Sequence, residues 1–384
     1  MDQRQPTRTV KRSRASLIIL IVLAFLLMAA AIVLAVSLPD DGSWRLAAGT
    51  SETDAIQLAG FDCTASEALQ LYPFASGVLH VTPHGVAFLD MSGSETWSSS
   101  LAMASPFAVR QGEWMLVGDR DGHAYAMFGD SGLLYSGTAA GRIVGLALSR
   151  DGQAALVQDQ LDSTGIVTVL EALTGTKQYD CHFPESGYVL SVSFTSDGTA
   201  FDVSLANTDG SSVKPVIKRY SAAGQEQGQI LPDLDSLYPL IVYDASGHPV
   251  ICSTTNLAAL DYGKDTPVWQ HAFDQVFSAE TTGSGLLVLA SGQAGGKPAL
   301  YLLDDRGESR AGPDPGDVTA GPAVFGNLAV LGSGKHLMVI NLATLDVIRE
   351  AVLDDEIIRC AFSGSQTVVA VTRSGVRGIP VQEP

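Results

Sequence analysis

Hydrophobic side chains recur along most of the chain in short runs that polar turns separate. Residues 165–180, GIVTVLEALTGTKQYD, show the pattern most clearly: an apolar segment leads into a polar turn with Thr174 and Gly175, and a more polar segment follows. This order predicts a β-hairpin, because glycine adopts the positive φ angles of tight turns at little steric cost. Related segments follow at intervals of a few tens of residues, which predicts stacked all-β repeats.

Eight windows share one order of segments. Each has a first strand, a turn such as SRDGQ or TSDGT, a strongly apolar second strand, an aliphatic third strand and a polar fourth strand. The windows are residues 77–104, 105–138, 141–183, 187–231, 236–273, 275–314, 318–352 and 356–381. The eighth window ends without a fourth strand. A segment near the N-terminus is expected to supply it and so to close the ring, with residues 44–49 or 55–58 as the candidates.

The middle strands of the windows are apolar at odd and even positions alike, as in GLLVLAS (285–291) and TVVAVT (367–372). Successive side chains point to opposite faces of a strand, so both faces must be buried. No amphipathic stretch of ten or more residues lies between them to supply covering helices. We therefore expect an all-β fold, a β-propeller of seven or eight blades, with eight favoured. The alternative is a two-sheet sandwich, which would alternate more cleanly between apolar and polar positions.

An apolar run of 22 residues, 17–38, precedes the repeats. At ~1.5 Å per helical residue it spans roughly 33 Å, enough to cross a hydrocarbon core of about 30 Å. Positions along the predicted membrane span include Leu17, Ile21, Phe25, Leu34 and Leu38. The basic residues that precede it are Arg4, Arg8, Lys11, Arg12 and Arg14. Basic flanks tend to stay in the cytoplasm, so we expect one membrane pass with the propeller outside the cytoplasm.

A cleaved signal peptide is the alternative for this run, because Ala35-Val36-Ser37 loosely fits a cleavage site. The run exceeds the length of about 7–15 residues that is usual for a signal-peptide core, which favours an uncleaved signal anchor. The predicted organisation is a basic cytoplasmic tail at 1–14, a membrane anchor at 15–38, a linker or arm at 39–72 and a propeller at 73–384.

The strongly negative net charge of the chain limits which partners it can bind. The chain has a formal net charge of −18, and the residues after 38 hold 18 basic and 40 acidic groups. A body this acidic repels polyanions, so we expect no nucleic acid among its partners. The expected partners are the lipid bilayer through residues 17–38 and a protein or another component of the cell envelope.

Two kinds of repeat resemble known families. VAFLDMSGSETW (86–97) and LAALDYGKDTPVW (257–269) resemble quinoprotein-type propeller repeats, whereas LSRDGQAALV (148–157) and FTSDGTAFDV (194–203) resemble WD40-like repeats. The whole layout is similar to that of bacterial membrane-anchored propellers, including the lipoprotein that assists outer-membrane protein assembly. The resemblance implies the propeller fold and no particular function.

The four cysteines follow the predicted membrane span, on the side where disulfides can form. We expect Cys181, Cys252 and Cys360 to be free thiols buried in strands. The alternative pairs Cys63 with Cys360 in a disulfide, which would tie the arm to the last blade.

No catalytic, cofactor-binding or metal-binding motif emerges from the sequence. His80 and His84 are separated by a turn with Pro83, and no CxxC pair or calcium loop is present. Acidic residues at turn positions are expected to cap backbone N–H groups; they are Asp90, Asp121, Asp151, Asp197, Asp261, Asp304 and Asp305.

The favoured function is therefore a membrane-anchored, extracytoplasmic scaffold that binds a protein or envelope partner. Residues 207–214 and 293–298, which vary most in length between windows, are the candidate contact loops. The alternative is an extracytoplasmic enzyme, either a quinoprotein-like dehydrogenase or a hydrolase. A tryptophan docking signature would support the dehydrogenase, but the chain has only four tryptophans, Trp44, Trp97, Trp114 and Trp269.

Overall fold

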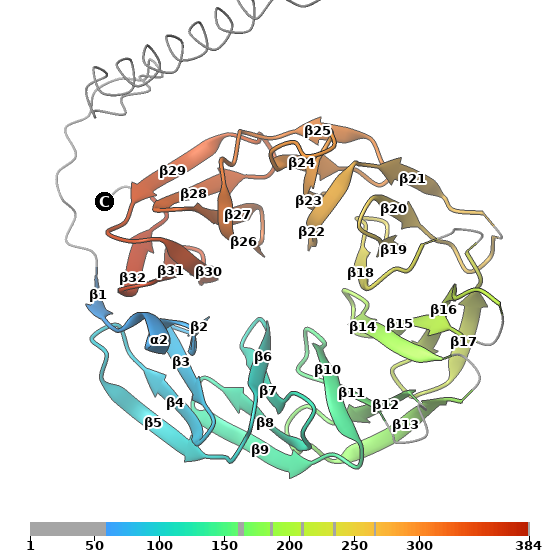
Figure 1. Ribbon diagram of the computed structural model, residues 1–384, viewed down its shortest axis with the longest axis horizontal. Coiled ribbons are helices and arrows are strands. Elements are labelled where there is room, and N and C mark those ends of the chain that lie inside the picture. Colours follow the sequence, from blue (N-terminus) through green and yellow to red (C-terminus); the bar gives the residue numbers. More distant parts are fainter. Residues whose placement is uncertain are drawn as a thin grey trace, which may run out of the picture. The chain divides into compact units, whose positions relative to one another are not determined.

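The computed structural model describes residues 59–159, 165–184, 187–208, 211–232, 236–264 and 266–382. In this part of the chain, eight four-stranded antiparallel sheets stand around a central axis as the blades of a propeller (Figure 1). The predicted all-β class and the favoured count of eight blades are confirmed. The two-sheet sandwich is wrong, because no pair of sheets stacks as an open two-layer core.

The first four blades follow the predicted windows, except that the first blade begins with β2, before the window 77–104. Their strands, from the centre outward, are β2 (Leu71–Phe74), β3 (Gly77–Thr82), β4 (Gly85–Leu89) and β5 (Glu95–Ser100); β6 (Pro106–Gln111), β7 (Trp114–Asp119), β8 (Ala124–Gly129) and β9 (Gly132–Thr138); β10 (Arg142–Leu148), β11 (Ala154–Asp159), β12 (Gly165–Leu170) and β13 (Lys177–Phe183); and β14 (Tyr188–Phe194), β15 (Ala200–Asn207), β16 (Lys214–Ser221) and β17 (Glu226–Ile230).

The last four blades complete the ring. Their strands are β18 (Leu240–Tyr243), β19 (Pro249–Cys252), β20 (Asn256–Ala259) and β21 (Trp269–Ala272); β22 (Gln275–Thr282), β23 (Gly285–Ser291), β24 (Ala299–Leu303) and β25 (Ser309–Ala311); β26 (Val318–Phe325), β27 (Leu328–Ser333), β28 (His336–Asn341) and β29 (Val347–Val352); and β30 (Ile357–Ser363), β31 (Thr367–Thr372), β32 (Gly375–Pro380) and β1 (Ala59–Asp62).

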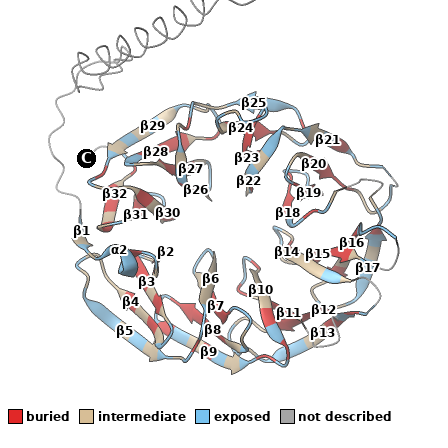
Figure 2. Cartoon of the chain, in the orientation of Figure 1, coloured by how far each residue is buried: buried red, intermediate tan, exposed pale blue. Residues whose placement is uncertain are grey.

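The hydrophobic core lies between the blades. Every position of β23 is buried, which follows from the two-sided apolar pattern of its sequence. Leu286 and Val288 on one face pack in a cluster with the preceding blade, and Leu287 and Leu289 on the other face pack with the following one. Burying one such side chain stabilises the fold by about 1.5–3 kcal/mol. Figure 2 shows this burial concentrated in the middle strands.

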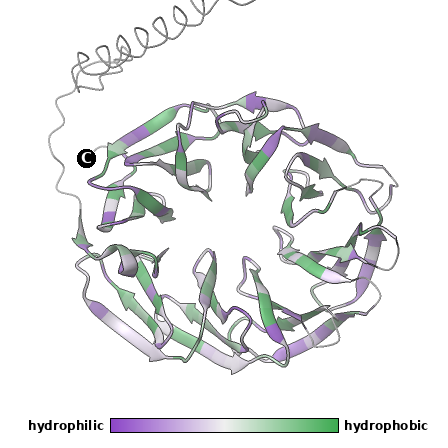
Figure 3. Ribbon diagram, in the orientation of Figure 1, coloured by the Kyte–Doolittle hydropathy of each residue, from purple (hydrophilic) through white to green (hydrophobic). Residues whose placement is uncertain are grey.

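The outermost strands are more polar, as the fourth segments of the windows predicted. All three residues of β25 are exposed, and exposed positions alternate with half-buried ones in β29. Figure 3 shows hydrophilic colouring on outer strands such as β17, β21 and β25, and hydrophobic colouring in the strands behind them. The outer strand therefore covers the open edge of each blade and adds only single residues to the core, such as Tyr135 and Phe183.

Aromatic rings also connect neighbouring blades. In five places an aromatic residue of an outermost strand lies against a positive-φ glycine at the third turn of the next blade. The pairs are Phe61 on Gly93, Trp97 on Gly132, Tyr135 on Gly175, Tyr179 on Gly224 and Trp269 on Gly307. A search for tryptophan alone misses this pattern, because phenylalanine and tyrosine fill three of the five places.

A strand from the N-terminal side closes the ring. β1 pairs with β32 as the fourth strand of the last blade, and Arg377 Nη2 donates to Asp62 Oδ1 at 2.7 Å across the junction. Closure by an N-terminal segment is thus confirmed, but the strand is Ala59–Asp62. The predicted closing segments, 44–49 and 55–58, lie outside the described residues.

The short helix α2 (Ala65–Ala68) connects β1 to β2, and Thr64 caps its first turn. β2, the innermost strand of the first blade, begins at Leu71. The propeller therefore includes part of the segment that the sequence assigned to a linker ending at residue 72.

Candidate functional site

The acidic turn residues mostly cap their own turns. Asp90 Oδ1 accepts bonds from the backbone N–H groups of Ser92 and Ser94 at 2.8 and 3.0 Å. Asp304 Oδ1 accepts two in the same way. Hydrogen bonds from the Ser92 hydroxyl and from these backbone groups lower the pKa of Asp90. These carboxylates stabilise turns, as expected, and do not converge on a common site.

Histidines and metal ligands do not gather either. His80 Nε2 lies 3.0 Å from Gln70 Oε1, and burial lowers the pKa of His80. Throughout the described ranges, no group of three or more His, Cys, Asp or Glu residues could hold a metal ion.

The four cysteines are free thiols. Cys181, Cys252 and Cys360 are buried in strands, as expected. Cys63 packs between the last and the first blade, whereas Cys360 belongs to the cluster between the seventh and eighth blades. The structure therefore does not contain the Cys63–Cys360 disulfide.

The predicted membrane anchor lies outside the described residues. This applies to Leu17, Ile21, Phe25, Leu34 and Leu38. It also applies to the basic residues before them, Arg4, Arg8, Lys11, Arg12 and Arg14. Within the residues that the structure describes, no helix has the length and apolar character that crossing a bilayer requires.

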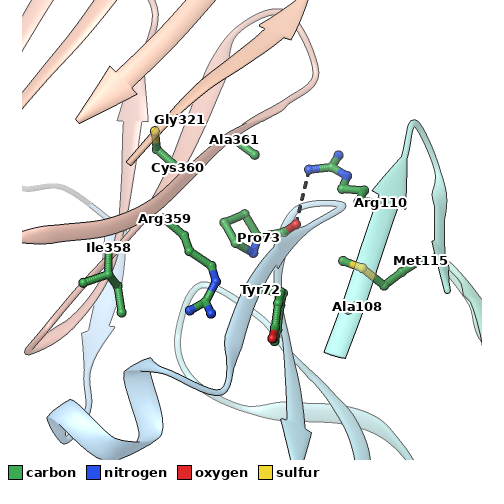
Figure 4. Close-up of a pocket in the computed structure, with 10 residues that line it drawn as sticks. All are labelled: Tyr72, Pro73, Ala108, Arg110, Met115, Gly321, Ile358, Arg359, Cys360 and Ala361. Atoms are coloured by element: carbon green, nitrogen blue, oxygen red, sulfur yellow. Dashed lines mark hydrogen bonds between the residues drawn. The ribbon is translucent and has the colours of Figure 1, made fainter. Parts of the chain in front are cut away.

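A cavity of about 240 Å³ opens beside the innermost strands of the first, second, seventh and eighth blades. We call it the arginine cavity. Figure 4 shows Arg110, from β6, and Arg359, from β30, reaching it on either side of Pro73 in β2. Its lining residues are Tyr72, Pro73, Ala108, Arg110, Met115, Gly321, Ile358, Arg359, Cys360 and Ala361.

Backbone carbonyls hold both guanidinium groups in place. Arg110 donates from Nε to Gly112 O at 3.1 Å and from Nη1 to Pro73 O at 3.3 Å. Arg359 donates from Nη1 to Ala68 O and Leu71 O at 3.4 and 3.3 Å. A guanidinium carries five N–H donors, so each arginine keeps donors that these carbonyls do not use.

A cation–π contact and a shifted pKa describe the electrostatics of the cavity. The guanidinium of Arg359 lies 4.4 Å from the ring centroid of Tyr72, a cation–π contact that orients it. Burial lowers the pKa of Arg110, and the negative charge of Asp130 opposes this only in part. In the described part of the chain, neither arginine forms an ion pair with a carboxylate, so their positive charge is not compensated at close range.

An apolar surface forms a second candidate. Tyr188 begins β14, Val213 precedes β16 and Leu231 follows β17, so all three lie at the same end of the fourth blade. Leu237 and Leu240 lie where the chain enters the fifth blade at that end. All five side chains are exposed, Leu231 by 63%. Single exposed apolar residues are ordinary, so it is the shared position of these five at one end of two neighbouring blades that makes them a candidate contact site. We call these five residues the blade 4–5 surface.

The predicted contact loops lie at this end of the ring. Residues 207–214 connect β15 to β16 and residues 293–298 connect β23 to β24, so both join the second and third strands of a blade. Because strands in a blade alternate in direction, these turns share an end with the connections between blades. The loop 207–214 adjoins the blade 4–5 surface through Val213.

Sequence reasoning did not single out the two arginines of the cavity. A signal was present, because Arg110 and Arg359 are charged residues within otherwise uncharged inner segments, PFAVRQ and IIRCAFS. The pattern cannot show that the two segments, about 250 residues apart, flank the same strand, since the closed ring brings the last blade beside the first.

Residues 53–312 match the family of unknown function DUF5711. The chain belongs to this family. The matched region runs from the closing strand β1 through the sixth blade, so in this DUF5711 chain Arg110 lies inside the match and Arg359 follows it. Among curated protein sequences, none matches the chain significantly.

Solved propellers are similar to this DUF5711 chain in fold. Sqt1 from Saccharomyces cerevisiae is 12% identical with a TM-score of 0.59, over 84% of this chain and 98% of that one. BamB from Moraxella catarrhalis is 13% identical with a TM-score of 0.52, over 83% and 98%. The computationally designed protein Ika8 is 16% identical with a TM-score of 0.55, over 81% and 95%. At these identities the likeness establishes the propeller fold alone.

Proposed function

We propose that this chain is a propeller tethered to the outer face of the cell membrane, where it binds a protein partner. The blade 4–5 surface is the observation that carries the proposal. Its exposed apolar residues come from three stretches of the chain and lie at the same end of the fourth and fifth blades. Such a group costs solubility unless a partner covers it, and the burial of apolar surface is the main favourable contribution to most protein association.

The length of the 17–38 run and the basic residues before it support the tether. A tether of this kind restricts the propeller to the membrane surface, which raises its effective concentration toward partners that are also membrane-bound. The fold adds support, because a rigid ring presents loops in fixed positions for recognition.

Site-specific photo-crosslinking in the native membrane tests the partner surface. We expect a photoreactive residue at Leu231 or Leu237 of the full chain to give a discrete adduct with one protein. Leu133 and Leu173 are matched controls, because both are exposed leucines at the opposite end of the ring. The adduct at Leu231 should disappear in Leu237→Glu. Equal labelling at all four positions, or none at Leu231 and Leu237, would refute the surface.

Membrane topology is tested separately. We expect the full chain to resist alkaline carbonate extraction. In right-side-out vesicles, an added protease should remove a C-terminal tag and spare an N-terminal one. Extraction of the chain into the soluble fraction, or the reverse pattern of protection, would refute the tether.

A further inference from the structure

We propose that the arginine cavity binds a carboxylate carried by an acidic segment of the protein partner, in a pocket separate from the blade 4–5 surface. This inference rests on the proposed function, because it assigns a second recognition element to the same protein partner. Its central observation is the pair of half-buried guanidinium groups that face one cavity without a carboxylate of their own.

The donors suit a carboxylate. Arg110 uses Nε and Nη1 in bonds to the backbone, and Arg359 uses Nη1, so their Nη2 groups stay available. The planar guanidinium matches the geometry of a carboxylate, and charge-assisted bonds of this kind are about twice as strong as neutral ones. The backbone carbonyls and the Tyr72 ring hold the arginines before the ligand arrives, which reduces the entropy lost on binding.

The electrostatics favour an anion. The protein around Arg110 disfavours its charged form, and a carboxylate bound beside it would offset that cost. This positive pair belongs to a chain whose net charge is −18. The overall negative field opposes extended polyanions such as nucleic acids, while the local field of two arginines still attracts a single carboxylate.

The size of the cavity limits the ligand. Sites for cofactors and drug-sized molecules occupy about 300–1,000 Å³, whereas this cavity has about 240 Å³. It can hold a glutamate or aspartate side chain or a chain terminus. Met115 and Ile358 supply apolar contacts for the methylene groups of such a residue.

The inner strands are charged asymmetrically. Glu280 is an exposed acid on β22 of the sixth blade, and β6, which carries Arg110, belongs to the second blade. These two blades stand opposite each other in a ring of eight (Figure 1). An acidic segment that enters the centre of the ring is therefore attracted to the arginine side, and it is repelled from the β22 side only above the Glu280 pKa of about 7.

Peptide binding to the purified full chain tests the inference. The probe is a fluorescein-labelled peptide of alternating glutamate and serine, followed by fluorescence anisotropy, and its glutamine counterpart is the control ligand. We expect the glutamate peptide to bind and the glutamine peptide not to bind. Arg110→Gln and Arg359→Gln should each weaken binding by about tenfold, as the loss of a charge-assisted contact predicts.

Matched variants separate the cavity from general charge effects. Arg150→Gln and Arg306→Gln remove the same charge from exposed positions and should change the affinity by less than about twofold. Ala361→Phe fills the cavity while keeping both arginines, and should also abolish binding. Arg110→Lys and Arg359→Lys, which keep the charge, should retain part of the affinity and the thermal midpoint of the wild type, so the result does not depend on whether a glutamine variant folds.

Each outcome bears on the inference. Equal weakening by all four glutamine variants, or binding of inorganic phosphate without binding of the peptide, would overturn it. If the peptide binds and only Leu237→Glu weakens it, the cavity assignment fails while the blade 4–5 surface stands. If the arginine variants act as expected but no photo-crosslink forms at Leu231 or Leu237, the cavity stands and the proposed surface fails.

Discussion

At the scale of single residues, the Asp202 carboxylate, between the fourth and fifth blades, accepts four side-chain hydrogen bonds. It is fully buried, with 0% exposure. Arg219 donates to it twice, from Nε at 2.9 Å and Nη2 at 2.7 Å. The hydroxyls of Tyr243 and Tyr262 donate at 2.9 and 2.7 Å. Burial and the charge of Asp202 raise the pKa of Tyr262, so its hydroxyl remains a donor.

We expect Asp202→Ala to lower the free energy of unfolding by about 3–5 kcal/mol, because it leaves the half-buried Arg219 without its counter-charge. Urea unfolding followed by circular dichroism measures the change. Asp274→Ala removes an exposed carboxylate and should stay within about 0.5 kcal/mol of the wild type. A similar loss in both variants would contradict a specific role for Asp202.

The stability of the folded chain is expected to depend on pH through the carboxyl group of Glu280. Desolvation by the surrounding protein raises the pKa of its carboxyl from 4.5 to about 7, although part of the side chain stays accessible to solvent. The folded chain therefore holds this proton more tightly than the unfolded chain. The stability that protonation provides is fully present below pH 4.5 and is lost as the pH rises through 7.

We accordingly expect Glu280→Gln to raise the thermal midpoint at pH 8 and to leave it almost unchanged at pH 5. Differential scanning calorimetry at the two pH values measures the difference. Glu308→Gln, an exposed glutamate in the same blade, should give the same small change at both. The prediction fails if Glu280→Gln has no greater effect at pH 8 than at pH 5.

At the scale of elements, the blades are held in register by contacts between one blade's outer strand and the next blade's third turn. Tyr135 in β9 lies against Gly175 in the turn before β13. Gly175 has φ of +66°, a conformation that glycine adopts without strain. The absence of a side chain at Gly175 serves two purposes, since it permits the turn and makes room for the aromatic ring of Tyr135.

Replacement of this glycine separates those two purposes. A Cβ on Gly175 would stand 2.3 Å from Cδ2 of Tyr135, whereas Gly247, with φ of +82°, has open space within 4 Å. We expect Gly247→Ala to cost about 1 kcal/mol from the backbone alone, and Gly175→Ala to cost about 1–3 kcal/mol more from the clash. Urea unfolding measures both.

A double variant tests whether the contact with Tyr135 causes the extra cost of Gly175→Ala. Because Tyr135→Ala removes the atoms that clash, the cost of Gly175→Ala should fall toward that of Gly247→Ala in a Tyr135→Ala background. Simple additivity of the two changes would contradict the contact.

At the scale of the whole molecule, the ring depends on one strand that is far away in the sequence. β1 pairs with β32 over four residue pairs, from Ala59 with Gly378 to Asp62 with Gly375. Arg377 forms an ion pair with Asp62 across the same junction and a second one with Asp354, which follows β29. Without β1, the outer edge of the eighth blade would present unpaired backbone groups, which other chains can pair with.

We expect a chain that begins at Cys63 to be less stable than one that begins at Gln57 by about 2–4 kcal/mol, because the backbone hydrogen bonds of four residue pairs are lost. Thermal unfolding measures the difference in stability, and sedimentation velocity should detect oligomers of the shorter chain. Equal midpoints and a monomeric shorter chain would show that β1 does not hold the ring together.

The repeated pattern of apolar strands and glycine turns determined the architecture from the sequence alone. Strands such as β23 and β31 are buried on both faces and consist of consecutive apolar residues. This local pattern was enough to predict a propeller of seven or eight blades, with eight favoured, and the approximate limits of most blades. Most of the turn acids were predictable for the same reason, since Asp90, Asp197, Asp261 and Asp304 bind backbone groups within a few residues of themselves.

The closing strand, the aromatic contacts and the arginine cavity depended on the tertiary structure. AGFD at 59–62 has no pattern that identifies it as the fourth strand of a blade whose other strands begin at Ile357. Arg110 and Arg359 likewise meet only because the circle closes and places the eighth blade beside the first. Local patterns record which side chains must be buried, whereas distant segments become neighbours only through the geometry of the closed ring.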